Sequence, residues 1–204
     1  MELTKSYRLR DREGEKMKKF ELTAEYVTNI FGKKLFRIKA LVEFGNVKEG
    51  ELGGFVEKES NIDDDGNAWV SGNAQVFGNA KISGNAQVYG NAKVFGNAQV
   101  FGNAWISGNA QVYGNACVAE NLDYAIVGGF GSEQQTITFF CQKDGSVGAK
   151  CGFFYGTLEE FREKVLETHG ERKYAQEYLM IADLMELHFA GGCDGNDKDD
   201  HSCL

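Results

Sequence analysis

Proline is absent from this 204-residue chain, although glycine occurs 26 times. The absence of proline excludes a collagen-like chain and argues against a disordered linker, because both are typically rich in proline as well as glycine. Glycine without proline instead favours a fold whose chain turns a corner at short, regular intervals, since glycine adopts the positive φ angles that tight corners need.

Long apolar segments and excess positive charge are also missing. No run of about 18 apolar residues is present, so we expect no membrane-spanning helix. The first 16 residues, MELTKSYRLRDREGEK, lack the apolar centre of a signal peptide. The net charge of −8 argues against a nucleic-acid-binding protein, which needs a basic face. We therefore expect neither a membrane nor a nucleic acid among the partners.

Closely paired cysteines are absent as well. The five cysteines are odd in number and irregularly spaced. Together with the missing export signal, they predict a cytoplasmic protein with reduced thiols. Cys193, Asp194, His201 and Cys203 could be drawn as a zinc site, but the cysteines lack the close pairing of known zinc sites. We expect a disordered acidic tail there, and neither a metal nor a cofactor.

Residues 66–119 consist of nine consecutive hexapeptides. Each begins with Gly-Asn-Ala and has Val or Ile in fifth position: GNAWVS, GNAQVF, GNAKIS, GNAQVY, GNAKVF, GNAQVF, GNAWIS, GNAQVY and GNACVA. A period of six is a multiple of the strand period of two but not of the helical period of 3.6, so it predicts short strands rather than a helix. The Gly-Asn pair suits the corner between strands, because both residues tolerate positive φ.

Read from Val70, the units VSGNAQ and VFGNAK resemble the hexapeptide repeat of left-handed parallel β-helices, with an aliphatic residue first and a small residue fifth. In that family three hexapeptides make one triangular turn. The resemblance therefore implies a mainly β fold with a left-handed parallel β-helix of about three turns. The chain departs from the enzymes of the family at the second position, where they usually carry a small residue and this chain has Ser, Phe or Tyr.

The flanking segments also resemble known proteins. They are RIKALVEFGNVKEGELGGFVEKESN before the repeat and, after it, the stretch from Asp123 through TFF, KDG, CGFFYGTLEEF and ETHGERKYAQEY. Both are similar to hexapeptide-repeat proteins common in phages and prophage-bearing bacteria, over roughly residues 18–190. This resemblance implies an architecture and no established chemistry.

The patterns divide the chain into a polar tail (1–16), an N-terminal β cap (17–65), the β-helix (66–119), a C-terminal β-hairpin and two-helix module (120–190) and a disordered acidic tail (191–204). Both flanks are expected to cap the coil, because a solenoid cannot leave its ends open. AEYVTNIF and KLFRIKALVEF predict two strands joined at Gly32 and Lys33. Thr157 and Glu160 form a capping box that begins one helix, and a second helix is expected from about Lys173 to Phe189.

Histidine is absent from the coil, which bears on catalysis. Many hexapeptide-repeat proteins are acyltransferases that use acetyl-CoA, and they need a general base, normally His, on or beside the coil. This coil has no His, Asp or Glu, and no inserted loop. His169 and His188 lie near predicted helix ends, where a structural role is the simpler interpretation. We therefore expect no catalytic residue, with a CoA-dependent acyltransferase whose donor binds between subunits as the alternative.

Stacking the turns 18 residues apart sorts the outward side chains onto three faces. On the first face Phe77, Phe95 and Tyr113 form an aromatic column that a monomer would expose. We predict that this column is the interface of a homo-oligomer, with a trimer favoured because related β-helices commonly trimerise along their flat faces. The alternative is that ring stacking merely stiffens the coil.

On the second face Trp69, Gln87 and Trp105 follow one another, with Tyr89 beside them. Aromatic planes can hold a flat ring, and a neighbouring amide can bind the polar edge of that ring. These four residues are the predicted binding site for a small ring-containing ligand. The alternative is that both tryptophans pack under the terminal caps.

These observations predict a non-enzymatic binding protein. The phage-type resemblance implies an accessory protein that occupies a host protein or sequesters a small ligand, with a role against host defence. A structural spacer or assembly module is a second alternative, beside the acyltransferase.

Overall fold

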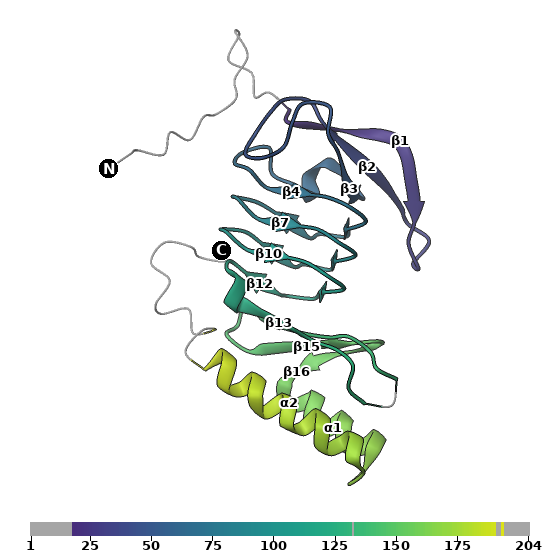
Figure 1. Ribbon diagram of the computed structural model, residues 1–204, viewed down its shortest axis with the longest axis vertical. Helices are drawn as coiled ribbons and strands as arrows, with labels where there is room; N and C mark the ends of the chain where they lie inside the picture. Colours follow the sequence, from purple (N-terminus) through teal and green to yellow (C-terminus); the bar gives the residue numbers. More distant parts are fainter. Residues whose placement is uncertain (1–17, 132, 191–192, 194–204) are drawn as a thin grey trace, which may run out of the picture.

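The computed structural model describes residues 18–131, 133–190 and 193. Three parts follow one another along its long axis: an N-terminal β layer, a β-solenoid, and a C-terminal sheet with two helices (Figure 1). The chain is therefore mainly β, as predicted. The predicted polar tail at 1–16 and, apart from Cys193, the predicted acidic tail at 191–204 lie outside the described residues.

Each hexapeptide contributes one two-residue strand to the solenoid. The strands are β4 (Trp69–Val70), β5 (Gln75–Val76), β6 (Lys81–Ile82), β7 (Gln87–Val88), β8 (Lys93–Val94), β9 (Gln99–Val100), β10 (Trp105–Ile106), β11 (Gln111–Val112) and β12 (Cys117–Val118). They pair in parallel as β4-β7-β10, β5-β8-β11 and β6-β9-β12. Gln87 pairs with both Trp69 and Trp105, so the 18-residue register predicted from the repeat is confirmed.

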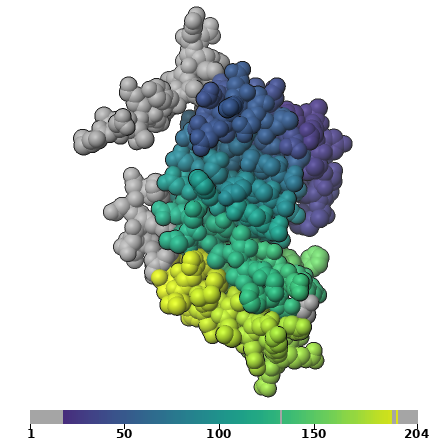
Figure 2. Space-filling model, viewed as in Figure 1, coloured from purple at the N-terminus to yellow at the C-terminus, as the bar shows by residue number. Residues whose placement is uncertain are grey.

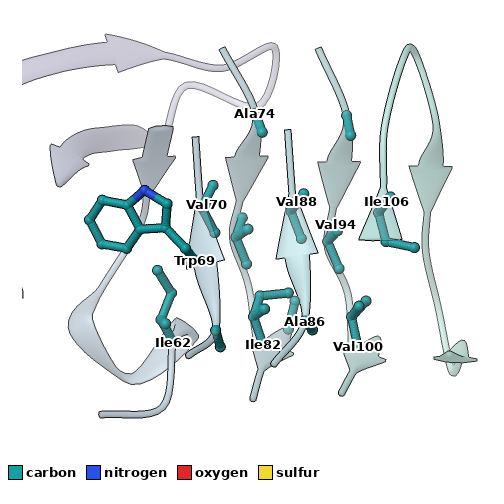
Figure 3. Packing of buried hydrophobic residues seen from close by; sticks show 14 of the residues in the cluster. Ile62, Trp69, Val70, Ala74, Ile82, Ala86, Val88, Val94, Val100 and Ile106 are labelled. Carbon is teal, nitrogen blue, oxygen red and sulfur yellow. The ribbon is translucent and has the colours of Figure 1, made fainter. Parts of the chain in front are cut away.

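The alanine and the Val or Ile of each hexapeptide fill the interior of the solenoid. All of these side chains are completely buried. Figure 3 shows Val70, Val88 and Ile106 in line, with Trp69 at the N-terminal end of the row. Burial of each Val or Ile contributes about 2 kcal/mol. These hexapeptides therefore place only alkyl groups inside the coil, and any ligand must bind outside it.

Glycine and asparagine form the corners between the strands. The glycine that begins each hexapeptide has a φ between 60° and 75°. The asparagine that follows bonds to its equivalent one turn further on, as in Asn67, Asn85 and Asn103, whose successive Nδ2–Oδ1 distances are both 3.0 Å. The corners therefore carry ladders of side-chain amides along the outside of the coil.

The parallel ladder begins before the first hexapeptide. Strand β3 (Leu52–Val56) pairs in parallel with β5, and Ile62, just after the short helix η1 (Glu59–Asn61), bridges in parallel to Ile82. These residues add a rung, which gives a solenoid of roughly four turns. The sequence places the segment before Gly66 in the cap, because this segment lacks the Gly-Asn-Ala motif of the later turns.

An antiparallel hairpin precedes this extra rung. It consists of β1 (Phe20–Thr28) and β2 (Lys34–Ala40), and β2 continues the sheet onto β3. One sheet therefore runs in the order β1-β2-β3-β5-β8-β11. The hairpin extends along the side of the coil, so its turn lies beside the solenoid rather than over its end (Figure 1).

A four-stranded antiparallel sheet closes the other end of the coil, and two helices cover its outer side (Figure 1). Its elements are η2 (Asn121–Asp123), β13 (Tyr124–Val127), β14 (Ile137–Cys141), β15 (Val147–Cys151), β16 (Phe154–Thr157), α1 (Leu158–His169) and α2 (Lys173–Phe189). Phe140 of β14 packs into the coil core and its neighbour Phe139 against the helices. The predicted capping box is confirmed, because Thr157 and Glu160 each accept a bond from the backbone N–H of the other. No helix in the described part of the chain is long and apolar enough to cross a membrane.

The cysteines do not all remain thiols. Cys141 in β14 and Cys193 after α2 form a disulfide bond, with a Cα–Cα distance of 5.4 Å. Cys117 is also disulfide-bonded, whereas Cys151 is free. The prediction of reduced cysteines is therefore wrong for Cys117, Cys141 and Cys193. The chain returns to β14 after α2 and brings Cys141 and Cys193 together. The spacing of the cysteines in the sequence does not indicate this proximity.

Candidate functional site

The aromatic column on the first face is covered by the chain's own hairpin. Phe77 and Phe95 stack with ring centroids 4.8 Å apart, and both are buried. Phe31 at the hairpin turn lies 6.1 Å from Phe77 and 6.4 Å from Phe95, and Leu35 packs in the same cluster. The predicted oligomer interface is therefore wrong for Phe77 and Phe95. The sequence predicts that the hairpin caps the end of the coil, whereas in the structure the hairpin covers one side of the coil (Figure 1).

The third member of the column lies beyond the hairpin. Tyr113 is only partly buried and packs edge-on against Tyr155 of β16, with centroids 4.7 Å apart. The C-terminal sheet thus covers part of the ring that the hairpin does not reach. Tyr113 is consequently also a poor candidate for a subunit interface.

On the second face Trp69 is in the core. It is 2% exposed and packs edge-on against Phe20, at 6.4 Å, and Phe44, at 5.4 Å. Both partners come from the N-terminal layer. Trp69 is therefore unavailable to a ligand, and the prediction of a ligand-binding role is wrong for this residue. The alternative of packing under a cap is the one the structure bears out here.

The other three predicted site residues gather around one groove. Gln87, Tyr89 and Trp105 line it together with Asn67, Asn85 and Asn103 of the corner ladder and residues 45–47 of the N-terminal layer. The groove has a volume of about 510 Å³. Trp105 is 54% exposed and Tyr89 40% exposed. We call this region the amide groove.

Side-chain amides fix the polar character of the amide groove. Gln87 Nε2 donates to the backbone oxygen of Asn67, at 2.8 Å, and to that of Asn85, at 3.3 Å. No donor among the described residues bonds to Gln87 Oε1. The asparagine ladder runs in one direction, since Asn67 donates to Asn85 and Asn85 donates to Asn103. It therefore ends in an amide acceptor at Asn67 and an amide donor at Asn103.

The backbone of Trp105 is held from both sides. Its N–H donates to Asn121 Oδ1, at 2.8 Å, and its carbonyl accepts a bond from the Tyr124 hydroxyl, at 2.7 Å. Both partners belong to the segment that leads from the coil into the C-terminal sheet. These two bonds fix the backbone position from which the exposed indole projects.

A smaller cavity of about 190 Å³ lies within the C-terminal module and contains Cys151, His169 and Tyr178. Burial raises the pKa of the Cys151 thiol, so the thiol stays protonated near neutral pH and is a weak nucleophile. The His169 ring lies against Tyr178, at 5.6 Å, and Tyr174, at 6.4 Å, as expected for a residue that closes a helix end. In the described part of the chain, no three His, Cys, Asp or Glu side chains gather closely enough to hold a metal ion.

The binding site predicted from the sequence did not include the asparagine ladder or the loop at 45–47. The ladder had a signal, because the 18-residue stacking that aligned Gln87 with Trp105 also aligns Asn67, Asn85 and Asn103. The loop had none, since its position on the coil depends on how the N-terminal layer folds back.

Residues 86–102 and 98–114 match a family model described as the YdcK beta solenoid repeat. The matched segments lie in the middle of the coil and include Gln87, Tyr89 and Trp105. They make the coil similar to that repeat and leave both flanking parts outside the match. No curated protein matches the sequence.

Proposed function

We propose that this protein is a non-enzymatic binding protein whose amide groove holds a small, uncharged, ring-containing ligand. One observation carries the proposal: two large aromatic side chains, Trp105 and Tyr89, are exposed at a groove whose other side-chain groups are mainly amides. Isolated exposed aromatics are common, but two beside one hollow lined by polar groups are typical of a ligand site.

The chemistry of the amide groove favours an uncharged ring. Aromatic side chains stack on the flat or apolar face of a ring, while amides donate to or accept from its polar edge. Gln87 offers an acceptor and Asn103 a donor. Among the described residues, no Asp, Glu, Lys, Arg or His lines the groove. A charged ligand would find no counter-charge there, whereas a nucleoside or a sugar ring would match both kinds of contact.

The same lining supports binding without catalysis. Acyl transfer needs a general base or an activated nucleophile beside the bound substrate. The amide groove is lined by asparagine, glutamine, glycine, valine and two aromatics, none of which acts as a base at neutral pH. The acyltransferase alternative therefore gains no support from this site.

The hexapeptide pattern also bears on the handedness of the coil and on the biological role of the protein. We infer that the solenoid is left-handed, as in the hexapeptide-repeat proteins that its sequence resembles. Within the phage-type group that the flanks resemble, a rigid coil with an external groove suits an accessory protein that sequesters its ligand. The groove is open at the surface, so the ligand can enter without a change in the fold.

Tryptophan fluorescence tests the proposal, because the chain has only two tryptophans. In a Trp69→Phe protein, Trp105 is the sole reporter. We expect its emission to change saturably with a nucleoside or a pyranoside, and Gln87→Ala to weaken that binding. Gln99→Ala is the matched control, since Gln99 has the same place in its hexapeptide on the third face. A Trp105 emission indifferent to both ligand classes would contradict the proposal, as would equal effects of the two glutamine variants.

A further inference from the structure

A second cavity lies on the first face of the coil, where three parts of the chain meet. The hairpin turn at 29–31 forms one side, the exposed ends of β5, β8 and β11 form the floor, and residues 150–155 of β15, β16 and their turn form the other side. Its volume is about 250 Å³. Figure 2 shows the hairpin along one edge of the molecule, above the green C-terminal module. We call this cavity the tip pocket; it shares no residue with the amide groove.

Aromatic rings form most of the apolar wall of the tip pocket. Phe77, Phe95 and Tyr113 contribute from the coil, and Tyr155 closes over Tyr113. Phe77 and Phe95 are buried and stack face to face, so the more exposed rings of this wall are those of Tyr113 and Tyr155. The stacked column therefore stabilises the coil and also lines a cavity.

The rim of the tip pocket carries large apolar side chains that are exposed to solvent. Ile30 and Phe31 at the hairpin turn are mostly exposed, and Phe153 in the β15–β16 turn is fully exposed. The two turns come from opposite ends of the coil, yet both line the same cavity. Exposed apolar groups that converge on one opening mark a binding site rather than random surface composition.

The charge of the tip pocket is opposite to that of the whole chain. Two lysines, Lys93 and Lys150, line it, and no Asp or Glu in the part of the chain that the structure describes does so, although the net charge of the chain is −8. Lys93 makes no side-chain hydrogen bond or ion pair with any described residue. Its ammonium group is therefore available to a ligand.

The ammonium group of Lys150 is buried. The residue is 8% exposed, and its Nζ donates to the backbone oxygens of Gly152 and Phe154. Among the described residues, no carboxylate lies within ion-pairing distance of it. Burial accordingly lowers the pKa of Lys150. A buried charge is costly unless an opposite charge compensates it, and an anion in the adjoining cavity would do so.

We propose that the tip pocket binds a small aromatic anion, whose ring packs among the aromatic side chains and whose anionic group pairs with Lys93 and Lys150. The volume favours a small molecule of at most about three rings, because drug-sized ligands occupy sites of about 300 Å³ or more. Carboxylate, sulfonate and phosphate groups all supply the required charge. The two sites of the chain would thus differ in chemistry, one for an uncharged ring and one for an anionic ring.

A pair of matched dyes tests the proposal on the full chain. 8-Anilinonaphthalene-1-sulfonate is an aromatic anion, and N-phenyl-1-naphthylamine is nearly the same molecule without the sulfonate. We expect one sulfonate dye to bind per chain, about tenfold more tightly than the neutral dye, because charge-assisted contacts are the strong ones. Lys93→Gln should remove most of this difference. Lys81→Gln should leave it unchanged, since Lys81 has the same hexapeptide position on the third face.

Two further experiments test where the dye binds and which anionic group the site prefers. Phe153→Ala changes a fully exposed side chain, so it should leave the fold intact and weaken both dyes alike. Trp105→Ala should change neither, which separates this site from the amide groove. Competition by benzoate, benzenesulfonate and phenyl phosphate then ranks the anionic groups. Equal binding of the two dyes, equal effects of the two lysine variants, or full binding by Phe153→Ala would each overturn the proposal.

Discussion

Trp69 and Trp105 occupy the same hexapeptide position on the same ladder, one on each side of Gln87, yet Trp69 is 2% exposed and Trp105 is 54% exposed. The repeat makes the two sites equivalent, and only the segments that flank the repeat distinguish them. Phe20 and Phe44 enclose Trp69, whereas no aromatic side chain among the described residues packs on Trp105 in the same way.

This difference predicts opposite effects of two matched substitutions. Trp69→Ala removes a buried ring and should lower the free energy of unfolding by about 3–5 kcal/mol. Trp105→Ala changes a largely exposed ring and should alter it by no more than about 0.5 kcal/mol. Urea denaturation followed by circular dichroism measures both. Similar costs for the two variants would contradict the burial of Trp69.

The buried aromatic column gives a second prediction. Phe95 lies between Phe77, Tyr113 and Phe31, so Phe95→Ala should destabilise the fold by about 3–5 kcal/mol. Phe95→Lys should be at least as damaging, because it places a charge under the hairpin. Sedimentation measures the oligomeric state and urea denaturation the stability of the fold. Together they distinguish destabilisation of the fold from loss of a subunit interface. A Phe95→Lys protein of unchanged stability that has merely become monomeric would restore the interface hypothesis.

Two neighbouring corners differ in how closely the backbone packs. A Cβ added at Gly102 would lie 2.6 Å from the Ala119 oxygen, whereas one at Gly108 would meet only Ile126 Cδ1, at 3.9 Å. Both glycines have positive φ, so alanine costs about 1–2 kcal/mol of backbone strain at either site. Gly102→Ala should cost clearly more, because the strand must also shift. Thermal melts of the two variants provide the comparison, and equal melting temperatures would argue against this corner geometry.

The buried ammonium of Lys150 predicts a pH dependence of stability. Its folded-state pKa lies below the ordinary value of 10.5, so between the two values the unfolded chain binds the proton more tightly. Stability should therefore rise with pH across that window. Lys150→Met lacks the titrating group and isolates its contribution from those of other residues. We expect wild type to gain stability relative to Lys150→Met as pH rises toward 10.5 in chemical denaturation experiments. A constant difference between the two proteins would mean that burial does not perturb Lys150.

The repeating structural features could be predicted from the sequence. Contacts between segments far apart in the sequence could not. The hexapeptides defined the strands, the interior and the alignment of Gln87 with Trp105, because each depends only on position within a period. The strands of the hairpin were also predictable from their composition. Its docking was not, since that depends on Phe31 and Leu35 meeting Phe77 and Phe95, which lie 40 or more residues away. The parallel pairing of Leu52–Val56 with the coil could not be predicted, because this segment lacks the repeat motif.

The candidate sites also differ in whether the repeat or contacts between distant segments form them. Periodicity brought Gln87, Tyr89 and Trp105 together, and these residues do line one groove. The tip pocket could not be predicted, because Lys93, Lys150 and Phe31 come from three separate parts of the chain. The Cys141–Cys193 bond joins residues 52 positions apart for the same reason.

The amide groove as a ligand site is the central claim, and native mass spectrometry tests it most directly. The full chain would be incubated with a mixture of uncharged nucleosides and pyranosides, beside a Trp105→Ala protein treated in the same way. We predict a non-covalent adduct of one ring compound per chain on the wild type, identified by its mass, and none on Trp105→Ala. A wild-type spectrum that shows only the bare chain, or an adduct that Trp105→Ala retains in full, would contradict the claim.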